Sequence, residues 1–204
     1  MKEAPRVAAI VLAAGSSRRM GPVNKLLADL RGRPILLHVM HAVRASRVSE
    51  IVVVTGHEQE RVRPLVERLA DRIVFNPRHA EGLSTSMIAG LDAVSSSADA
   101  AVICLGDMPW LTTTHIDRLI SAFEPDGGRE ICVPVYQGRR GNPVLWSRRF
   151  FDEMRAITGD QGARRLLAAH SDVIVEVEME DGGVLEDIDT PERLAVARAP
   201  DQKR

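Results

Sequence analysis

The chain has 204 residues, a formal net charge of −1 and 45% hydrophobic residues. That length suits one domain with a sizeable core, and the hydrophobic content excludes a disordered chain. The 27 basic and 28 acidic residues nearly cancel, so no global field points to nucleic acid or to an anionic membrane, and an anionic substrate must be met by local charge. The sequence contains no internal repeat, linker or low-complexity stretch, and we expect a single domain over residues 1–204.

The cysteines and the N-terminus predict a cytoplasmic protein. Cys104 and Cys132 each lie in an apolar run, which favours buried thiols over a disulfide, and reduced thiols are typical of the cytosol. Residues 1–5 lack the apolar core of a signal peptide. The longest apolar runs have the length of a strand, so we expect no membrane span.

The first two thirds of the chain alternate apolar, β-branched runs with helical patterns. Strands are predicted at 7–12, 51–55, 72–75, 100–105 and 131–135, and helices at 34–45, 58–70, 84–94 and 112–123. Continuous apolar runs such as that at 100–105 imply burial on both faces, as in a parallel sheet covered by helices. Pro34 suits a first helical turn. The regular alternation predicts an α/β sandwich.

The regular alternation of predicted strands and helices ends after about residue 134. A turn between two extended arms is predicted around 138–141, and short helices follow at 147–157 and 161–169. An extended run at 173–179 leads to a turn at Asp181-Gly-Gly, and the last helix opens with Thr190 as N-cap and Pro191 as first residue.

The most informative segment runs from Val7 to Lys25. A buried strand breaks into a loop of small residues that carries Arg18 and Arg19 and is followed by Lys25. Small residues let backbone N–H groups approach phosphate oxygens, and the cations neutralise them. The loop lacks the Gly-Lys-Ser/Thr end of a Walker motif and the three glycines of a dinucleotide fingerprint. A plain strand-to-helix turn with solvated arginines is the alternative, but the buried strand and the lysine favour a nucleoside triphosphate.

Aspartates follow two other predicted extended segments. Asp107 lies at the carboxyl end of a buried strand, the edge at which ligands bind in open α/β sheets, and could hold Mg²⁺. Capping by Asp107 is not needed, because a threonine at 112–114 could cap the next helix. Asp187 and Asp189 share one face of an extended segment, so that one could complete the metal site while the other caps. Spacing alone does not choose between them.

A serine-rich segment at 76–86 runs from a strand into a helix start on the same edge of the sheet. Ser84 is the expected N-cap, and Ser86 would then be free to hydrogen-bond a base or ribose. His57 and His79 lie in loops, where a lone histidine is more often a surface residue than a ligand.

Six segments in this order resemble the nucleotidyltransferases of the molybdenum-cofactor group, most of all those that transfer a cytidylyl group. They lie at 12–21 with 24–27, 81–86, 105–109, 138–144, 159–164 and 185–192. The resemblance implies a three-layer α/β/α Rossmann-like sandwich with a mostly parallel sheet, of the glycosyltransferase-A-like (nucleotide-diphospho-sugar transferase) type. It also implies Mg²⁺-dependent transfer of CMP from CTP to the terminal phosphate of molybdopterin, with release of pyrophosphate. The Ala13-Ala14-Gly15 sequence, where guanylyl-transferring relatives read Ala-Gly-Gly, favours cytidine.

The resemblance also implies roles for single residues. Nucleotide contacts are expected from Ala13, Ala14, Gly15, Ser16, Lys25, Gly82, Ser86 and Asp107. Catalytic roles are expected for Arg19, Lys25 and Asp107, metal binding for Asp107 and Asp189, and acceptor binding for Asn142 and Arg164.

The expected partners are CTP and a molybdopterin-type phosphorylated acceptor, with a molybdoenzyme or chaperone as the protein partner, and neither nucleic acid nor membrane. Two alternatives remain at this stage. One is a guanylyltransferase, or a cytidylyltransferase acting on another phosphorylated acceptor. The other is a non-catalytic nucleotide- or cofactor-binding carrier, although the joint presence of Lys25, Asp107 and Asp189 argues for an enzyme.

Overall fold

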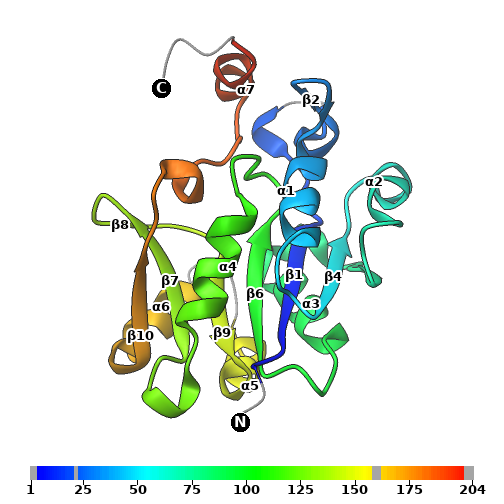
Figure 1. The fold of residues 1–204 in the computed structure, drawn as a ribbon. Helices are drawn as coiled ribbons and strands as arrows, with labels where there is room; N and C mark the ends of the chain where they lie inside the picture. Colours follow the sequence, from blue (N-terminus) through cyan, green and yellow to red (C-terminus); the bar gives the residue numbers. More distant parts are fainter. Residues whose placement is uncertain (1–3, 21–22, 158–161, 200–204) are drawn as a thin grey trace.

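A computed structural model describes residues 4–20, 23–157 and 162–199, without the side chains of 18 and 162–164. Its main sheet has the order β10-β7-β9-β6-β1-β4-β5, with the short β8 paired to β7 (Figure 1). The strands are β1 (Val7–Ala13), β4 (Glu50–Thr55), β5 (Arg72–Phe75), β6 (Ala100–Leu105), β7 (Ile131–Tyr136), β8 (Arg139–Arg140), β9 (Val144–Ser147) and β10 (Ile174–Glu178). Within the seven-strand path only β9 runs against its neighbours, which confirms the predicted mostly parallel sheet.

Helices cover both faces of this sheet. They are α1 (Ile35–Arg44), α2 (Gln59–Val66), α3 (Leu83–Ala93), α4 (Thr113–Ala122), α5 (Phe151–Arg155), α6 (Gly162–Ala169) and α7 (Pro191–Arg198). Short 3-10 helices lie at Arg18–Met20, Lys25–Leu27, His79–Glu81, Pro125–Gly127, Arg148–Phe150, Ser171–Val173 and Gly182–Leu185. None of the helices in the described ranges is long and apolar enough to cross a membrane.

The alternation of side chains along β1 builds two cores. Val7, Ala9 and Val11 belong to the core that includes α1, α2 and α4. Ala8 and Ile10 face the opposite core, which includes α3, α5 and α6. All these side chains are at most 1% exposed. Because successive side chains of a strand point to opposite faces, a strand without polar residues must be covered by other elements on both faces of the sheet. The three layers predicted from the sequence are therefore confirmed.

A third, smaller cluster ties the two ends of the chain together. A hairpin of β2 (Asp29–Leu30) and β3 (Arg33–Pro34) packs against α7, beside which it lies in Figure 1. The cluster contains Met20, Ala28, Leu30, Ile35, Ile188 and Leu194. Met20 follows the small-residue loop and Ile188 lies between two of the singled-out aspartates, so this cluster packs the two segments against each other.

Two predicted helix starts are wrong. Pro34 ends β3 with an extended ψ of 142° and stands before α1, so it is not a first-turn residue. Ser84 is not the N-cap of α3, because the helix begins one residue earlier and Gly82 holds the cap position with φ 127°. That φ is readily adopted only by glycine. Thr112 and Thr190 do cap α4 and α7, each accepting a hydrogen bond from the backbone three residues on.

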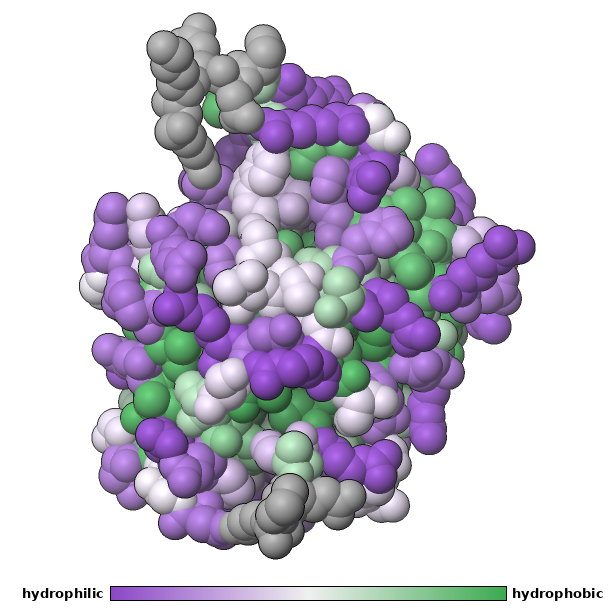
Figure 2. Space-filling view, in the orientation of Figure 1, coloured by the Kyte–Doolittle hydropathy of each residue, from purple (hydrophilic) through white to green (hydrophobic). Residues whose placement is uncertain are grey.

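The outer surface carries few large apolar side chains. In the view of Figure 2 hydrophilic residues predominate and apolar ones form separate small areas. Cys104 and Cys132 are free and buried, as predicted, and burial raises the pKa of each thiol to about 12. Such thiols are not reactive nucleophiles at neutral pH.

Candidate active site

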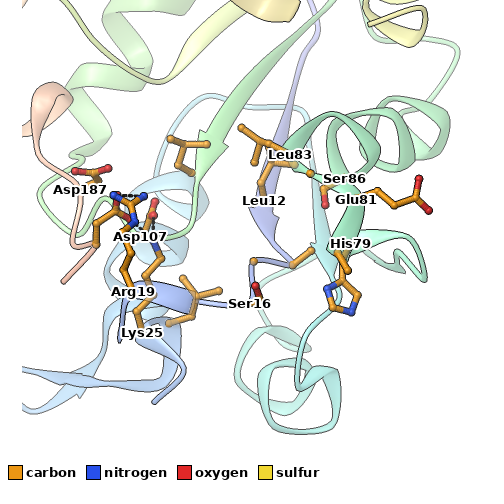
Figure 3. A pocket seen from close by; sticks show the side chains of 17 residues that line it. Leu12, Ser16, Arg19, Lys25, His79, Glu81, Leu83, Ser86, Asp107 and Asp187 are labelled. Carbon is orange, nitrogen blue, oxygen red and sulfur yellow. Dashed lines mark hydrogen bonds and ion pairs between the residues drawn. The ribbon is translucent and has the colours of Figure 1, made fainter. Parts of the chain in front are cut away.

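One pocket of about 610 Å³ lies at the carboxyl ends of β1 and β6 (Figure 3). Three of the segments singled out in the sequence line it, and the 185–192 segment contributes two aspartates. The lining residues are Leu12, Ala14, Gly15, Ser16, Arg19, Lys25, Leu26, His79, Ala80, Glu81, Gly82, Leu83, Ser86, Leu105, Asp107, Asp187 and Asp189. The pocket therefore lies at the sheet edge where the sequence predicts ligand binding.

The small-residue loop is held in a compact shape by its own polar groups. Ser17 is buried with φ 51°, and its hydroxyl accepts a hydrogen bond from the Lys25 backbone N–H at 3.1 Å. The Asn24 side chain accepts from the Leu26 N–H at 3.1 Å and caps the short helix that begins at Lys25. A Cβ at Gly15 would meet nothing within 4 Å, so its backbone is open to the pocket. The loop thus offers open backbone and fixes where Lys25 starts.

Three carboxylates meet at one end of the pocket. Oxygens of Asp107, Asp187 and Asp189 lie within 4.8 Å of one another. The Ile188 N–H donates to the Asp107 carbonyl at 3.0 Å and so lays the C-terminal segment beside the end of β6. At Gly106 a Cβ would come within 2.9 Å of the Leu12 carbonyl oxygen, so glycine at this position lets the end of β6 lie close to the end of β1. Spacing left Asp187 and Asp189 as alternatives, and the structure brings both to the cluster.

Two cations pair with Asp107 and Asp189 of this cluster. Lys25 Nζ donates to Oδ2 of Asp107 and, at 2.5 Å, to Oδ1 of Asp189. Arg19 Nη2 lies 2.6 Å from the other oxygen of Asp189. The Lys25, Asp107 and Asp189 side chains are 14%, 15% and 18% exposed, whereas Arg19 is 72% exposed. Lys25 is therefore the enclosed cation and Arg19 the solvated one.

The charges set opposite pKa shifts on neighbouring aspartates. Burial raises the pKa of Asp187, and the negative charges of Asp189 and Asp107 add to the rise. Burial also opposes ionisation of Asp189, but hydrogen bonding and charge from Lys25, with the charge of Arg19, bring its pKa below the usual value. For Lys25, burial is outweighed by Asp107 and Asp189, and its pKa is raised. Lys25 is thus a cation throughout the neutral range.

The start of α3 forms the other end of the pocket. Asn76 donates to Oγ of Ser86 at 3.0 Å and to Oγ1 of Thr85 at 2.9 Å. The sequence predicts a free Ser86 hydroxyl, but its oxygen accepts a hydrogen bond from Asn76. The hydroxyl retains its own hydrogen for donation. Asn76 was missed as a site residue, and its only signal was a polar residue directly after a strand.

His79 also lines this end, contrary to the surface position expected for it. Its ring is half-buried, its centroid lies 6.2 Å from that of His57, and its Nδ1 is enclosed without a hydrogen-bond partner among the described atoms. A Cβ on Gly56 would lie 2.6 Å from the His79 Cβ, so glycine at the end of β4 makes room for the ring. No local pattern indicates such a tertiary contact.

Three further predicted residues lie elsewhere or outside the description. Ala13 does not line the pocket, because alternation along β1 turns its side chain into the core beneath α1. Asn142 is not in the lining either, and its backbone N–H donates to the Val184 carbonyl at 2.9 Å. The Arg164 side chain is outside the described residues. The acceptor-side expectations for Asn142 and Arg164 therefore stay predictions.

Close backbone packing carries the C-terminal aspartates to the site. A Cβ at Gly141 would lie 2.2 Å from the Val184 carbonyl, and one at Gly183 would lie 2.4 Å from the Trp110 carbonyl. The Asp181 side chain accepts from the Gly183 N–H at 2.8 Å and fixes this turn. The glycines let the turn press against its neighbours and direct the chain toward Asp187.

Comparison with known families matches residues 9–173 to the model of the MobA-like NTP transferase domain. The chain belongs to this family. The small-residue loop, Asp107 and both cations lie within the matched range, and Asp187 and Asp189 follow it in the chain. The protein is accordingly a nucleotidyltransferase, and the MobA-like assignment confirms the enzyme expected from the sequence over the non-catalytic carrier.

Several curated relatives align with nearly the whole MobA-like chain. The purine catabolism protein PucB of Bacillus subtilis is 32% identical over 95% of this chain and 97% of its own. Molybdenum cofactor cytidylyltransferase of Escherichia coli is 32% identical over 93% of this chain and 94% of its own. Nicotine blue oxidoreductase of Paenarthrobacter nicotinovorans is 28% identical over 93% of this chain and 95% of its own. Relatives of similar identity thus carry different names, and identity alone does not select a substrate.

Solved structures confirm the MobA-like fold. Rv0371c of Mycobacterium tuberculosis H37Rv superposes with a TM-score of 0.82 over 95% of this chain and 98% of that chain, at 26% identity. A second structure of Rv0371c is a complex with manganese, with a TM-score of 0.78, covering 95% of this chain and 98% of that chain at 25% identity. A nucleotidyl transferase from Methanothermobacter, 22% identical over 95% of this chain and 96% of its own, has a TM-score of 0.81. The expected nucleotide-diphospho-sugar transferase type of sheet is confirmed.

Proposed function

We propose that this MobA-like enzyme transfers CMP from CTP to the terminal phosphate of molybdopterin and releases pyrophosphate. The observation that carries the proposal is the meeting of Lys25 with Asp107 and Asp189 beside the open Gly15 loop. The 32% identity to the cytidylyltransferase of Escherichia coli supports the choice of nucleotide and acceptor. The Ala13-Ala14-Gly15 sequence of the loop, in place of the Ala-Gly-Gly of guanylyl-transferring relatives, also supports cytidine.

The carboxylate cluster suits a divalent cation. Asp107, Asp187 and Asp189 offer only oxygen, the donor that Mg²⁺ and Mn²⁺ prefer, and they converge on one point. We infer that Asp107 and Asp189 hold Mg²⁺, with Asp187 beside them. When bound, the ion would neutralise the nucleotide phosphates and orient them. The related Rv0371c has been seen with manganese.

The chain's own groups have separate tasks in the transfer. The backbone at Gly15 and Ser16 faces the pocket and would bind phosphate oxygens. Lys25 and Arg19 would stabilise the charge that develops on the α-phosphate and on the leaving pyrophosphate. An oxygen of the acceptor phosphate attacks the α-phosphorus in line, and the bond from that phosphorus to the bridging oxygen breaks. The acceptor phosphate is already ionised at neutral pH, so the attack needs no general base.

The nucleoside would lie toward the start of α3. Gly82 and Ser86 line that end, and the Ser86 hydroxyl hydrogen is available to a base or ribose oxygen. Asn142 and Arg164 are proposed for the acceptor, with a molybdoenzyme or chaperone receiving the product. A second candidate is nucleotidyl transfer to a different phosphorylated acceptor, since PucB, also 32% identical, is named for purine catabolism and not for the molybdenum cofactor.

Pyrophosphate release tests the proposal. Purified protein and Mg²⁺ are offered CTP or GTP with molybdopterin, or with sugar and polyol phosphates, and products are identified by mass. We expect pyrophosphate and the cytosine dinucleotide only with CTP and molybdopterin. Turnover with GTP, or with another acceptor alone, would replace the specific function but keep the enzyme class.

A further inference from the structure

The ammonium group of Lys25 stands in the middle of the carboxylate cluster. It binds one oxygen of Asp107 and one of Asp189, while Arg19 takes the second Asp189 oxygen at 2.6 Å. The three inner side chains are less than one fifth exposed, so water screens these contacts only weakly. Lys25 thus holds together two carboxylates that would otherwise repel each other.

A divalent ion cannot share this position. Oxygens of the cluster lie within 4.8 Å of one another, and Mg²⁺ lies about 2.0–2.1 Å from each of its ligands. An ion bound by both Asp107 and Asp189 would occupy the space between them, where Lys25 Nζ lies. The ammonium has to move away before both carboxylates can bind the ion.

We propose that Lys25 is a removable counter-ion that keeps the metal position closed until a nucleotide arrives. Its four-carbon stem is flexible, and the pocket it lines also contains the Gly15 and Ser16 backbone. A triphosphate bound there offers the displaced ammonium new anionic partners in place of Asp107 and Asp189. Metal and nucleotide therefore bind with positive coupling, and the coupling is reciprocal. The inference rests on the proposed nucleotide site, not on the identity of the acceptor.

A metal titration without nucleotide tests the inference directly. Free Mn²⁺ is followed by electron paramagnetic resonance with the full chain and with Lys25→Met, which keeps the apolar stem. We expect the variant to bind Mn²⁺ more tightly, by roughly 5- to 150-fold, the usual range of a coupling between sites. The matched control is Arg193→Met, which removes an exposed guanidinium 3.9 Å from Asp187. Equal affinities of wild type and Lys25→Met overturn the inference, and so does an equally large effect of Arg193→Met.

Adding CTP separates this inference from the proposed function. In the wild type CTP should tighten Mn²⁺ binding by a similar factor, and in Lys25→Met it should do so less. If no nucleotide binds at all, the proposed function fails, while the nucleotide-free comparison still decides the role of Lys25.

A second measurement does not depend on the folding of a variant. The chain has only three lysines, at positions 2, 25 and 203, so lysine labelled with ¹³C at Cε gives a spectrum in which Lys25 is readily assigned. We expect its signal to stay unchanged when Mg²⁺ is added alone and to shift when CTP accompanies the ion. A full shift with Mg²⁺ alone contradicts the inference.

Discussion

The two ends of the pocket are built on different principles. The charged end, formed by Arg19, Lys25, Asp107, Asp187 and Asp189, gathers ionised groups from the loop after β1, the end of β6 and the segment before α7. Figure 3 shows Arg19, Lys25, Asp107 and Asp187 grouped on one side of the pocket, with Ser16 between them and the start of α3. Its geometry is held by ion pairs and by backbone hydrogen bonds between distant segments, from Ile188 to Asp107 and from Gly106 to Leu12.

The helix end, formed by His79, Glu81, Gly82, Leu83 and Ser86 and supported by Asn76, relies mainly on neutral groups. Its one carboxylate among these residues, Glu81, pairs with Arg78 at 2.7 Å. Its polar contacts are hydrogen bonds of ordinary length, such as that from Asn76 to Ser86 at 3.0 Å. Neutral hydrogen bonds contribute about 1 kcal/mol each, whereas preorganised charges facing a transition state contribute several times more. On the proposed function, we expect the charged end to determine the rate and the helix end to determine which nucleotide binds.

The largest effect is expected from Asp107→Asn, which removes a charge from the metal cluster while keeping the shape of the side chain. Nucleotidyl transfer should fall by at least about 10³-fold, because the ion loses one of its two proposed carboxylate ligands. Steady-state pyrophosphate release measures this, with circular dichroism to verify folding. Asp152→Asn is the matched control, since Asp152 is 96% exposed and lies outside the pocket. A folded Asp107→Asn enzyme with more than a tenth of wild-type activity would contradict the assignment.

Lys25→Ala should be next, with kcat lowered on the order of 10²–10³-fold, a typical loss for one preorganised charge in a site. Because the charge acts mainly as pyrophosphate departs, KM for CTP should change less than kcat. Initial rates over a range of CTP concentrations give both. Arg198→Ala is a control that removes a cation bonded to the Asp29 carbonyl and outside the pocket lining. Near-normal kcat in Lys25→Ala would show that the charged end does not set the rate.

Ser86→Ala should have a smaller effect of another kind. Loss of one neutral hydrogen bond costs about 1 kcal/mol, so KM for CTP should rise about fivefold with kcat nearly unchanged. The same kinetics with Ser97→Ala, a change at an exposed serine, should match wild type. A large fall in kcat with unchanged KM would place Ser86 in the rate-determining chemistry and remove the distinction between the two ends.

The smallest effects concern stability, and they should have opposite signs at two positions of one segment. The pKa of Asp189 is lowered by folding, so its charge stabilises the protein above the unfolded pKa near 3.8, and that stability is lost as pH falls through the folded value. The pKa of Asp187 is raised, so its ionisation costs stability above that range.

In metal-free buffer at pH 7, Asp189→Asn should therefore lower the melting temperature and Asp187→Asn should raise it slightly. Both differences should shrink as pH falls and the carboxyl groups become protonated. Thermal unfolding between pH 3 and pH 7 checks the signs, and two shifts in the same direction would contradict the described charge arrangement.

Much of the parallel half of the fold could be predicted from the sequence, because its strands are continuous apolar runs. The predicted bounds of β5 and β6 agree with the structure, and the position of Asp107 at a ligand edge follows from them. Contacts between distant segments could not be predicted. The backbone hydrogen bond from Ile188 to Asp107 brings Asp187 and Asp189 to the cluster. The spacing of these residues in the sequence does not predict this bond.

The start of α3 shows the same limit. Serine at position 84 has the stronger capping propensity, but the close turn needs a φ of 127°, and Gly82 adopts it. The contacts of Ser86 with Asn76, and of His79 with Gly56, join separate segments of the chain and exist only once the sheet has formed.

The most direct test of the central claim is a single-turnover reaction with CTP labelled at its α-phosphate, in the presence of Mg²⁺ and molybdopterin. Nucleotidyl transfer at the charged end predicts that all of the label enters the dinucleotide product and none enters pyrophosphate. Transfer of a label from the γ-phosphate to the acceptor, or no transfer of the α-label with any nucleoside triphosphate, would contradict it.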